Sequence, residues 1–261
     1  PEGWTRPFAA DAAPPPVEVE TPLAPALALN FPGLGDPNGA IPPDTHGAVG
    51  PTKVMTTLNT QVLVQNRTGG ITSGPLSLGG FWTGIATSGV FDPRVLYDPD
   101  PAYGGRWIWV AVQGAEAAAS GLLVAASSGS EPVRGPGALF DADPTNAVWA
   151  DYPSVGFNKN WVVVQVNMFE LPPGSAFVRS EVYVFEKADL YAGVFAPTVI
   201  SLDAPACTTG CGGPQVPATT YDFMRRSGRS GYRRRAATAT SSAASAGSAR
   251  TSSSARAHGR L

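Results

Sequence analysis

Three aspartates open similar stretches of this sequence, and paired carboxyl groups are the usual acid and base in glycoside hydrolysis. Asp44 begins DTHGAVGP, Asp92 begins DPRVLYDP, and Asp151 begins DYPSVGFN. If the folded chain brings the three together, one carboxyl could act as acid and another as base on a glycosidic bond. Asp44, Asp92 and Asp151 are therefore the candidate catalytic residues, for a glycoside hydrolase.

The same residues also have a purely structural interpretation. Pro93 biases Asp92 towards extended backbone, so the Asp-Pro pair leads naturally into a strand. An aspartate at that point can accept backbone hydrogen bonds in an Asx-type bend. A structural role recurs with each repeated unit, whereas a catalytic role usually does not. The recurrence therefore favours structure over catalysis.

Other side chains at the openings of these stretches could contact a ligand. His46 is the single histidine outside the C-terminal region, which leaves Ser-His-Asp or histidine-based zinc chemistry without partners. Arg94 supplies a positive charge and Tyr152 an aromatic ring. The predicted ligand-binding residues are Asp44, His46, Asp92, Arg94, Asp151 and Tyr152.

Two acidic pairs have the spacing of oxygen ligands for Ca²⁺, the one cofactor that the sequence suggests. Asp98 and Asp100 form DPD, and Asp141 and Asp143 form DAD. The prolines that follow Asp98 and Asp143 also fit ordinary surface turns. A calcium site at either pair is a hypothesis beside that alternative.

The two cysteines, Cys207 and Cys211, lie in the stretch ACTTGCGG. An even pair in a glycine-rich loop suits a small disulfide in an oxidising compartment. A metal site would need two further ligands, and no histidine lies near. A disulfide is predicted, with a reduced pair as the alternative.

Tryptophan side chains could stack on sugar rings or fill a core. Alternation along WIWV puts Trp107 and Trp109 on the same face of one strand, where we expect them to pack between neighbouring sheets. The tryptophans considered for either role are Trp82, Trp107, Trp109, Trp149 and Trp161.

Repetition indicates which elements hold these residues. Each aspartate opens a unit in which a turn and a second apolar strand follow, the latter starting at Val54, Trp107 and Trp161. Third strands are predicted at 61–65, 121–126 and 181–185, and weaker fourth strands at 74–78 and 198–202. The middle unit shows no clear fourth strand. Units of four short antiparallel strands at intervals of about 50 residues are typical of propeller blades.

The predicted fold is therefore all-β: a partial β-propeller of about three four-stranded antiparallel blades with a truncated fourth. Dense punctuation by 30 Gly and 26 Pro agrees with this class. We assign a Pro-rich lead-in to residues 1–35 and the propeller portion to 36–224. The blades are predicted at about 41–80, 88–141 and 149–203, with the truncated one beginning near Val216–Phe223.

Residues 225–261 have a different character from the rest. All 20 acidic residues precede them, and they hold nine of the 18 basic residues, all Arg, among Ser and Ala. The segment is predicted to be disordered, as a frameshift or truncation scar or as a basic arm. Nucleic-acid binding is disfavoured because the charges are sparse and the segment contains a single aromatic residue for base stacking.

Several motifs together resemble a family of secreted bacterial β-propeller proteins of uncharacterised function. They are IPPDTHGAVGP, FDPRVLYDP with GGRWIWVAV, WADYPSVGFN, and VYVFEKADLYAG. The match covers about residues 30–224, and this sequence departs from the family pattern at its C-terminal end. The resemblance implies a propeller that is exported or displayed at a bacterial cell surface.

The opening DP-x-V is also similar to that of five-bladed glycosidases, in which that Asp serves as general base. Sialidases, which are propellers too, would require an arginine cluster and Asp-box repeats, and neither is present. We expect an extracellular, noncatalytic scaffold or binding module whose partner is a glycan or a cell-surface protein. The alternative is a glycoside hydrolase. No apolar run is long enough to span a membrane.

Overall fold

A computed structural model describes residues 28–203 and 216–221 of the chain. By its internal contacts the chain divides into residues 1–30 and residues 31–261. Residues 28–30 of the first unit have no regular secondary structure. The cysteine pair, most of the Pro-rich lead-in and the basic segment 225–261 lie outside the described residues.

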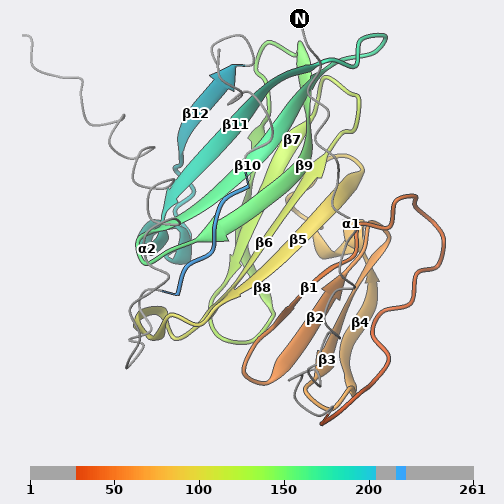
Figure 1. Ribbon diagram of the computed structural model, residues 1–261, viewed down its shortest axis with the longest axis vertical. Helices are drawn as coiled ribbons and strands as arrows, with labels where there is room; N and C mark the ends of the chain where they lie inside the picture. The colour runs from red at the N-terminus through yellow and green to blue at the C-terminus, as the bar shows by residue number, and fades with distance from the viewer. Residues whose placement is uncertain (1–27, 204–215, 222–261) are drawn as a thin grey trace, which may run out of the picture. The chain divides into compact units, whose positions relative to one another are not determined.

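The second unit contains three four-stranded antiparallel sheets (Figure 1), which confirms the all-β prediction. In each sheet the strands neighbour one another in sequence order. The first sheet contains β1 (His46–Val49), β2 (Lys53–Thr57), β3 (Gln61–Asn66) and β4 (Ile71–Ser77). The second contains β5 (Val90–Asp98), β6 (Arg106–Gln113), β7 (Gly121–Ser127) and β8 (Arg134–Asp141). The third contains β9 (Val148–Phe157), β10 (Trp161–Glu170), β11 (Phe177–Glu186) and β12 (Thr198–Asp203).

Short helical segments connect or follow the sheets. Helix α1 (Leu78–Phe81) follows β4, the 3₁₀ turn η1 (Pro101–Tyr103) lies between β5 and β6, and α2 (Lys187–Tyr191) separates β11 from β12. Ser77 caps α1 by accepting a hydrogen bond from the Gly80 N–H at 3.1 Å, the usual role of serine at a helix start. No helix among the described residues is long and apolar enough to cross a membrane.

The middle sheet does have a fourth strand, β8, at a place where the sequence contains no clear strand signal. Its sequence RGPGALFD contains two glycines and a proline, which are unfavourable in a strand interior. None of its residues is fully buried, because it is the outermost strand of its sheet. An edge strand tolerates proline because the outer side of the ladder needs no N–H donor.

The middle sheet is covered on both faces. Along β6, Ile108 and Val110 belong to the core shared with the third sheet, and Trp107 and Trp109 belong to the core shared with the first. All four side chains are at most 1% exposed. Alternate residues thus face opposite neighbours, and the prediction that the two tryptophans pack between blades is confirmed.

Neighbouring sheets contact one another most closely at their first strands, β1 against β5 and β5 against β9. Each chain path therefore begins on the inside of its sheet and ends at the outer strand. Sequential four-stranded meanders packed face to face, with their first strands innermost, form a partial β-propeller. Each first strand begins at the same end of the propeller, which is where the three predicted aspartates lie.

Residues 216–221 return to the first strand of the third sheet. The Thr220 N–H donates to the Phe157 carbonyl at 2.8 Å, and the Tyr221 ring packs edge-on against the Phe157 ring. A Cβ atom on Gly156 would lie 2.7 Å from the carbonyl oxygens of Pro217 and Ala218, so only glycine admits this approach. The segment thus lies beside β9, at the end away from Asp151.

Candidate functional site

The three aspartates singled out from the sequence do converge. Asp44 lies two residues before β1, Asp92 lies near the start of β5, and Asp151 lies near the start of β9. The carboxyl groups of Asp44 and Asp151 lie close enough to that of Asp92 to shift its pKa. One acidic side chain from each blade therefore contributes to a single group, which we call the carboxyl triad.

The three residues do not, however, occupy equivalent positions in their blades. In the second blade, Asp92 and Pro93 form a bulge opposite β6, between the pairs Phe91–Val112 and Arg94–Val110. In the third blade the corresponding bulge is formed by Tyr152 and Pro153, between the pairs Asp151–Asn167 and Ser154–Gln165. Tyr152 is thus the counterpart of Asp92, and Asp151 lies one residue earlier. The predicted equivalence is wrong by one residue.

The backbone conformation of Asp92 also differs from the one predicted. Instead of being extended, Asp92 has a φ of 51°, and Asp44 and Tyr152 have values of 47° and 48°. Aspartate tolerates this left-handed conformation better than most residues, because its short polar side chain can bond locally. Tyrosine does not share this advantage, and such strain is concentrated at functional sites. Near the start of each blade, one residue therefore has the left-handed backbone conformation.

Asp92 accepts a backbone hydrogen bond, as the structural interpretation predicted, but not in an Asx bend of its own blade. Its Oδ2 atom accepts from the Tyr152 N–H at 3.0 Å, which joins the second blade to the third. Asp92 is only 6% exposed. A buried carboxyl that binds across blades contributes to the scaffold as well as to the site.

Sequence reasoning missed Asn59, which joins the first blade to the second. Its Nδ2 donates to Asp44 Oδ2 at 2.5 Å, and its Oδ1 accepts from the Asp92 N–H at 2.6 Å. It lies in the turn between β2 and β3, where asparagine is common for reasons unrelated to any site. No sequence signal distinguished it.

Proximity of three acids changes their ionisation. Burial, the hydrogen bond to Asp44, and the charges of Asp44 and Asp151 together raise the pKa of Asp92 to about 7. Burial also raises the pKa of Asp151, although the hydrogen bond from Asp92 opposes this shift. At neutral pH the triad therefore retains a proton on Asp92 in part of the molecules, which reduces repulsion among the carboxyl groups.

His46, Arg94 and Tyr152 surround the triad. His46 Nδ1 accepts from the Val95 N–H at 3.3 Å, and burial followed by the charge of Arg94 lowers the pKa of His46. The Arg94 guanidinium lies 4.5 Å from the centre of the Tyr152 ring and donates to the Pro153 carbonyl. All six residues predicted to bind a ligand thus lie in one region, and Tyr152 is 48% exposed there.

A depression adjoins Asp151 at this end of the propeller. Its volume is about 230 Å³, and its lining contains Asp151 and Glu116 together with the rings of Trp149 and Phe169. Trp149 continues a row of rings, 6.3 Å from Phe91 and 5.8 Å from Phe169 between centres. Two aromatic rings and two carboxyl groups thus line one small hollow. Glu116 and Phe169 were not predicted from the sequence.

The first of the two predicted calcium pairs has a different partner. The carboxyl groups of Asp98 and Asp100 bind the Lys187 ammonium, with Nζ–Oδ2 distances of 2.8 and 3.2 Å. Lys187 and Asp98 are fully buried, and the Tyr191 hydroxyl donates to Asp98 Oδ2 at 2.6 Å. A cation is indeed bound here, but it is a lysine side chain. The Lys187 ammonium thus contacts both carboxyl groups of the pair for which calcium was predicted.

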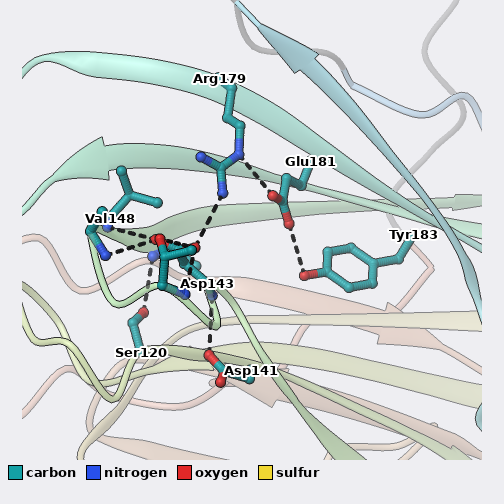
Figure 2. A network of polar contacts seen from close by, with 10 residues as sticks. Ser120, Asp141, Asp143, Val148, Arg179, Glu181 and Tyr183 are labelled. Carbon is teal, nitrogen blue, oxygen red and sulfur yellow. Dashed lines mark hydrogen bonds and ion pairs between the residues drawn. The ribbon is translucent and has the colours of Figure 1, made fainter.

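The second pair takes part in a polar network between the loop after β8 and the strand β11 (Figure 2). Asp143 accepts hydrogen bonds from the N–H groups of Thr145, Ala147 and Val148, and its Oδ1 lies 3.9 Å from Arg179 Nη2. Burial alone would raise the pKa of Asp143, but these donors lower it overall. Asp141 accepts from the Asp143 N–H. The Asp143 carboxyl oxygens are thus bound by protein N–H groups and lie beside Arg179.

The same network continues along β11. Arg179 Nε donates to Glu181 Oε1 at 2.8 Å, and the Tyr183 hydroxyl donates to Glu181 Oε2 at 3.2 Å. Burial and the charge of Glu181 raise the pKa of Tyr183, so this hydroxyl stays protonated. Within residues 28–203 and 216–221, no group of three or more His, Cys, Asp or Glu residues has a geometry that could hold a metal.

Comparisons with known proteins add little to this description. No protein-family model matches the chain, and no curated protein sequence matches it. Among solved structures, a match was found to a GH43 endo-arabinanase from Bacillus licheniformis, with 12% identity and a TM-score of 0.27. The match covers 54% of this chain and 64% of that enzyme, less than two thirds of its length. A likeness this distant carries no argument about chemistry.

Proposed function

We propose that this protein is an extracellular carbohydrate-binding propeller module, and that the depression beside Asp151 receives a sugar residue. The observation that supports the proposal is the lining of this hollow by two aromatic rings and two carboxyl groups. Sugar recognition needs an apolar surface for the C–H face of the ring and acceptors for its hydroxyl groups. Small-molecule sites combine these features, with an apolar lining and a few placed polar groups.

The chemistry of the lining gives each residue a role. Trp149 and Phe169 would stack against the ring, and Asp151 and Glu116 would accept hydroxyl hydrogen bonds. At about 230 Å³, the hollow is smaller than the ~300–1000 Å³ of pockets for drug-sized ligands. We therefore expect a single sugar unit, such as the end of a chain, to be bound there.

Binding is best tested with a panel of oligosaccharides, followed by calorimetry on those retained. Trp149→Ala should weaken binding by about tenfold, the equivalent of roughly 1.4 kcal/mol of lost stacking. Trp161→Ala is a matched control, because Trp161 lies at the other end of β10 and donates to Glu186. If no oligosaccharide binds, or if both variants bind like the wild type, the proposal is wrong. Retention of a cell-surface protein alone would also contradict it.

A second candidate, glycoside hydrolysis, is favoured by one observation. A carboxyl group whose pKa is raised to about 7 beside two other carboxyl groups suits a general acid at neutral pH. Against it, Asp92 is nearly buried and its Oδ2 is held by the Tyr152 N–H. Hydrolysis of chromogenic glycosides that Asp92→Asn abolishes, in a protein that remains folded, would establish this candidate in place of simple binding.

A further inference from the structure

Lys187 and Asp98 have an arrangement that goes beyond an ordinary ion pair. Lys187 begins α2, directly after β11 of the third sheet, and Asp98 ends β5 in the second sheet. Their side chains meet with Nζ 2.8 Å from Oδ2, and neither side chain is exposed to solvent. A nucleophilic nitrogen and a carboxyl group are thus held in contact between two blades.

A second carboxyl group completes the arrangement. Asp100 Oδ2 lies 3.2 Å from the same Nζ, and Asp100 Oδ1 accepts from the Ala102 N–H. Asp100 can therefore take a proton from the lysine while its own position stays fixed. Asp98 also binds the Tyr191 hydroxyl, whereas Asp100 binds the Ala102 N–H. Asp98 can therefore react while Asp100 carries protons.

The surroundings exclude water, because the Lys187 and Asp98 side chains are fully buried. The Phe157 and Tyr103 rings lie 5.2 and 5.8 Å from Nζ. A buried ion pair bears the desolvation cost of both ions, and conversion to a neutral group would remove that cost. The Tyr191 hydroxyl, 2.6 Å from Asp98 Oδ2, would stabilise negative charge that develops on this oxygen.

From this geometry we propose that Lys187 and Asp98 condense to an isopeptide bond, with Asp100 as the proton carrier. The ammonium transfers one proton to Asp100, and the neutral Nζ attacks Cγ of Asp98. The tetrahedral oxyanion accepts the Tyr191 hydroxyl hydrogen bond. A C–N bond forms and a C–O bond of Asp98 breaks. The departing oxygen leaves as water, and both protons of this water come from the lysine nitrogen, one of them delivered by Asp100. Nothing is oxidised or reduced, and the ammonium and carboxylate charges cancel.

Such a bond would join the second and third blades covalently. It would close a loop from residue 98 to residue 187, which contains the rest of the second sheet and the first three strands of the third. A covalent closure restricts the unfolded chain in the same way as a disulfide, but reductants do not break it. The interface between these blades would then resist separation under any redox condition.

The test is the intact mass of the denatured full chain. We expect the mass to fall short of the sequence mass by one water, and peptide mapping to find the peptide containing Asp98 joined to the one containing Lys187. Lys187→Met should restore the sequence mass. Asp100→Asn, a near-isosteric change, should fold by circular dichroism and yet lack the bond. Asp189→Asn, an exposed change on the same helix, should keep it.

A folded wild-type chain with the full sequence mass would overturn the proposal. A water loss that persists in Lys187→Met, or that maps to a succinimide elsewhere, would overturn it as well. If Asp100→Asn forms the bond as completely as the wild type, the role given to Asp100 is wrong.

Discussion

The two ends of β5 each carry a cluster of aspartates, and the two clusters limit charge repulsion in different ways. At the start of the strand, Asp92 meets Asp44 and Asp151, and a proton on Asp92 relieves the repulsion. At the end of the strand, Asp98 and Asp100 bind a buried lysine. The first cluster adjoins a hollow lined with rings, whereas the second is closed to solvent.

This difference separates a candidate site from a structural connection. A cluster that depends on a proton changes its charge with pH and leaves Asp151 available beside the hollow. A cluster that depends on a lysine has a fixed partner and no accessible atom. Two clusters of acidic residues at the ends of one strand therefore have different roles, and the neighbouring elements determine which role each has.

Removal of the lysine should produce the largest effect. Lys187→Met leaves two carboxyl groups buried without their cation, and we expect the free energy of unfolding to fall by about 3–5 kcal/mol. Denaturant unfolding at pH 7 measures this loss. The matched control is Glu131→Gln, which breaks the exposed pair with Lys53 and should cost no more than about 1 kcal/mol. Equal losses in the two variants would contradict the comparison.

The carboxyl triad should make stability depend on pH in the opposite sense to ordinary acid denaturation. A raised folded-state pKa means that the folded chain holds a proton that the unfolded chain releases between pH 4 and 7. The contribution of Asp92 is therefore complete below about pH 4 and is lost as the pH rises through about 7. Each unit of pKa shift corresponds to about 1.4 kcal/mol.

Asp92→Asn measures this contribution directly, because asparagine keeps an acceptor for the Tyr152 N–H but cannot titrate. Relative to the wild type, the variant should gain a few kcal/mol in free energy of unfolding between pH 4 and pH 8. Asp189→Asn, at an exposed position, should show no such trend. If the difference in free energy of unfolding between the variant and the wild type does not change with pH, the pKa of Asp92 is not raised and this prediction is wrong.

A smaller effect should follow from Asn59→Ala. The change deletes the acceptor for the Asp92 N–H and the donor to Asp44, so we expect a loss of about 1–3 kcal/mol. Thermal or denaturant unfolding measures it, with the exposed Asn160→Ala as control at about 0.5 kcal/mol or less. If Asn59→Ala also stays within the control value, Asn59 does not connect the blades.

The repeated sequence pattern made the three blades predictable, but it did not predict the exact register of the first strand in the third blade. Matching Asp92 with Asp151 follows the chemistry of the side chain, but the backbone matches Pro93 with Pro153. In both blades the bulge contains the proline, which has no N–H to pair, together with the residue before it, which has a positive φ. An alignment on the prolines would have shown the offset.

The partners of Asp98 and of Asp92 could not be predicted, for a different reason. Lys187 is 89 residues from Asp98 along the sequence, and Asn59 is 33 from Asp92. Local spacing carries no information about contacts that arise only when one sheet packs on the next. The DPD spacing suggested calcium, whereas the packed fold places the Lys187 ammonium beside both carboxyl groups.

The middle sheet, covered on both faces, has one further consequence. Residues of β6 and β7 have no solvent-facing side, and every residue of β7 is buried. Amide protons on these strands can exchange with solvent only when a neighbouring sheet has moved away or the whole unit opens. Those of β4, whose residues are all exposed, need only local fraying. Deuterium uptake should therefore proceed from the rim inward, with the central sheet last.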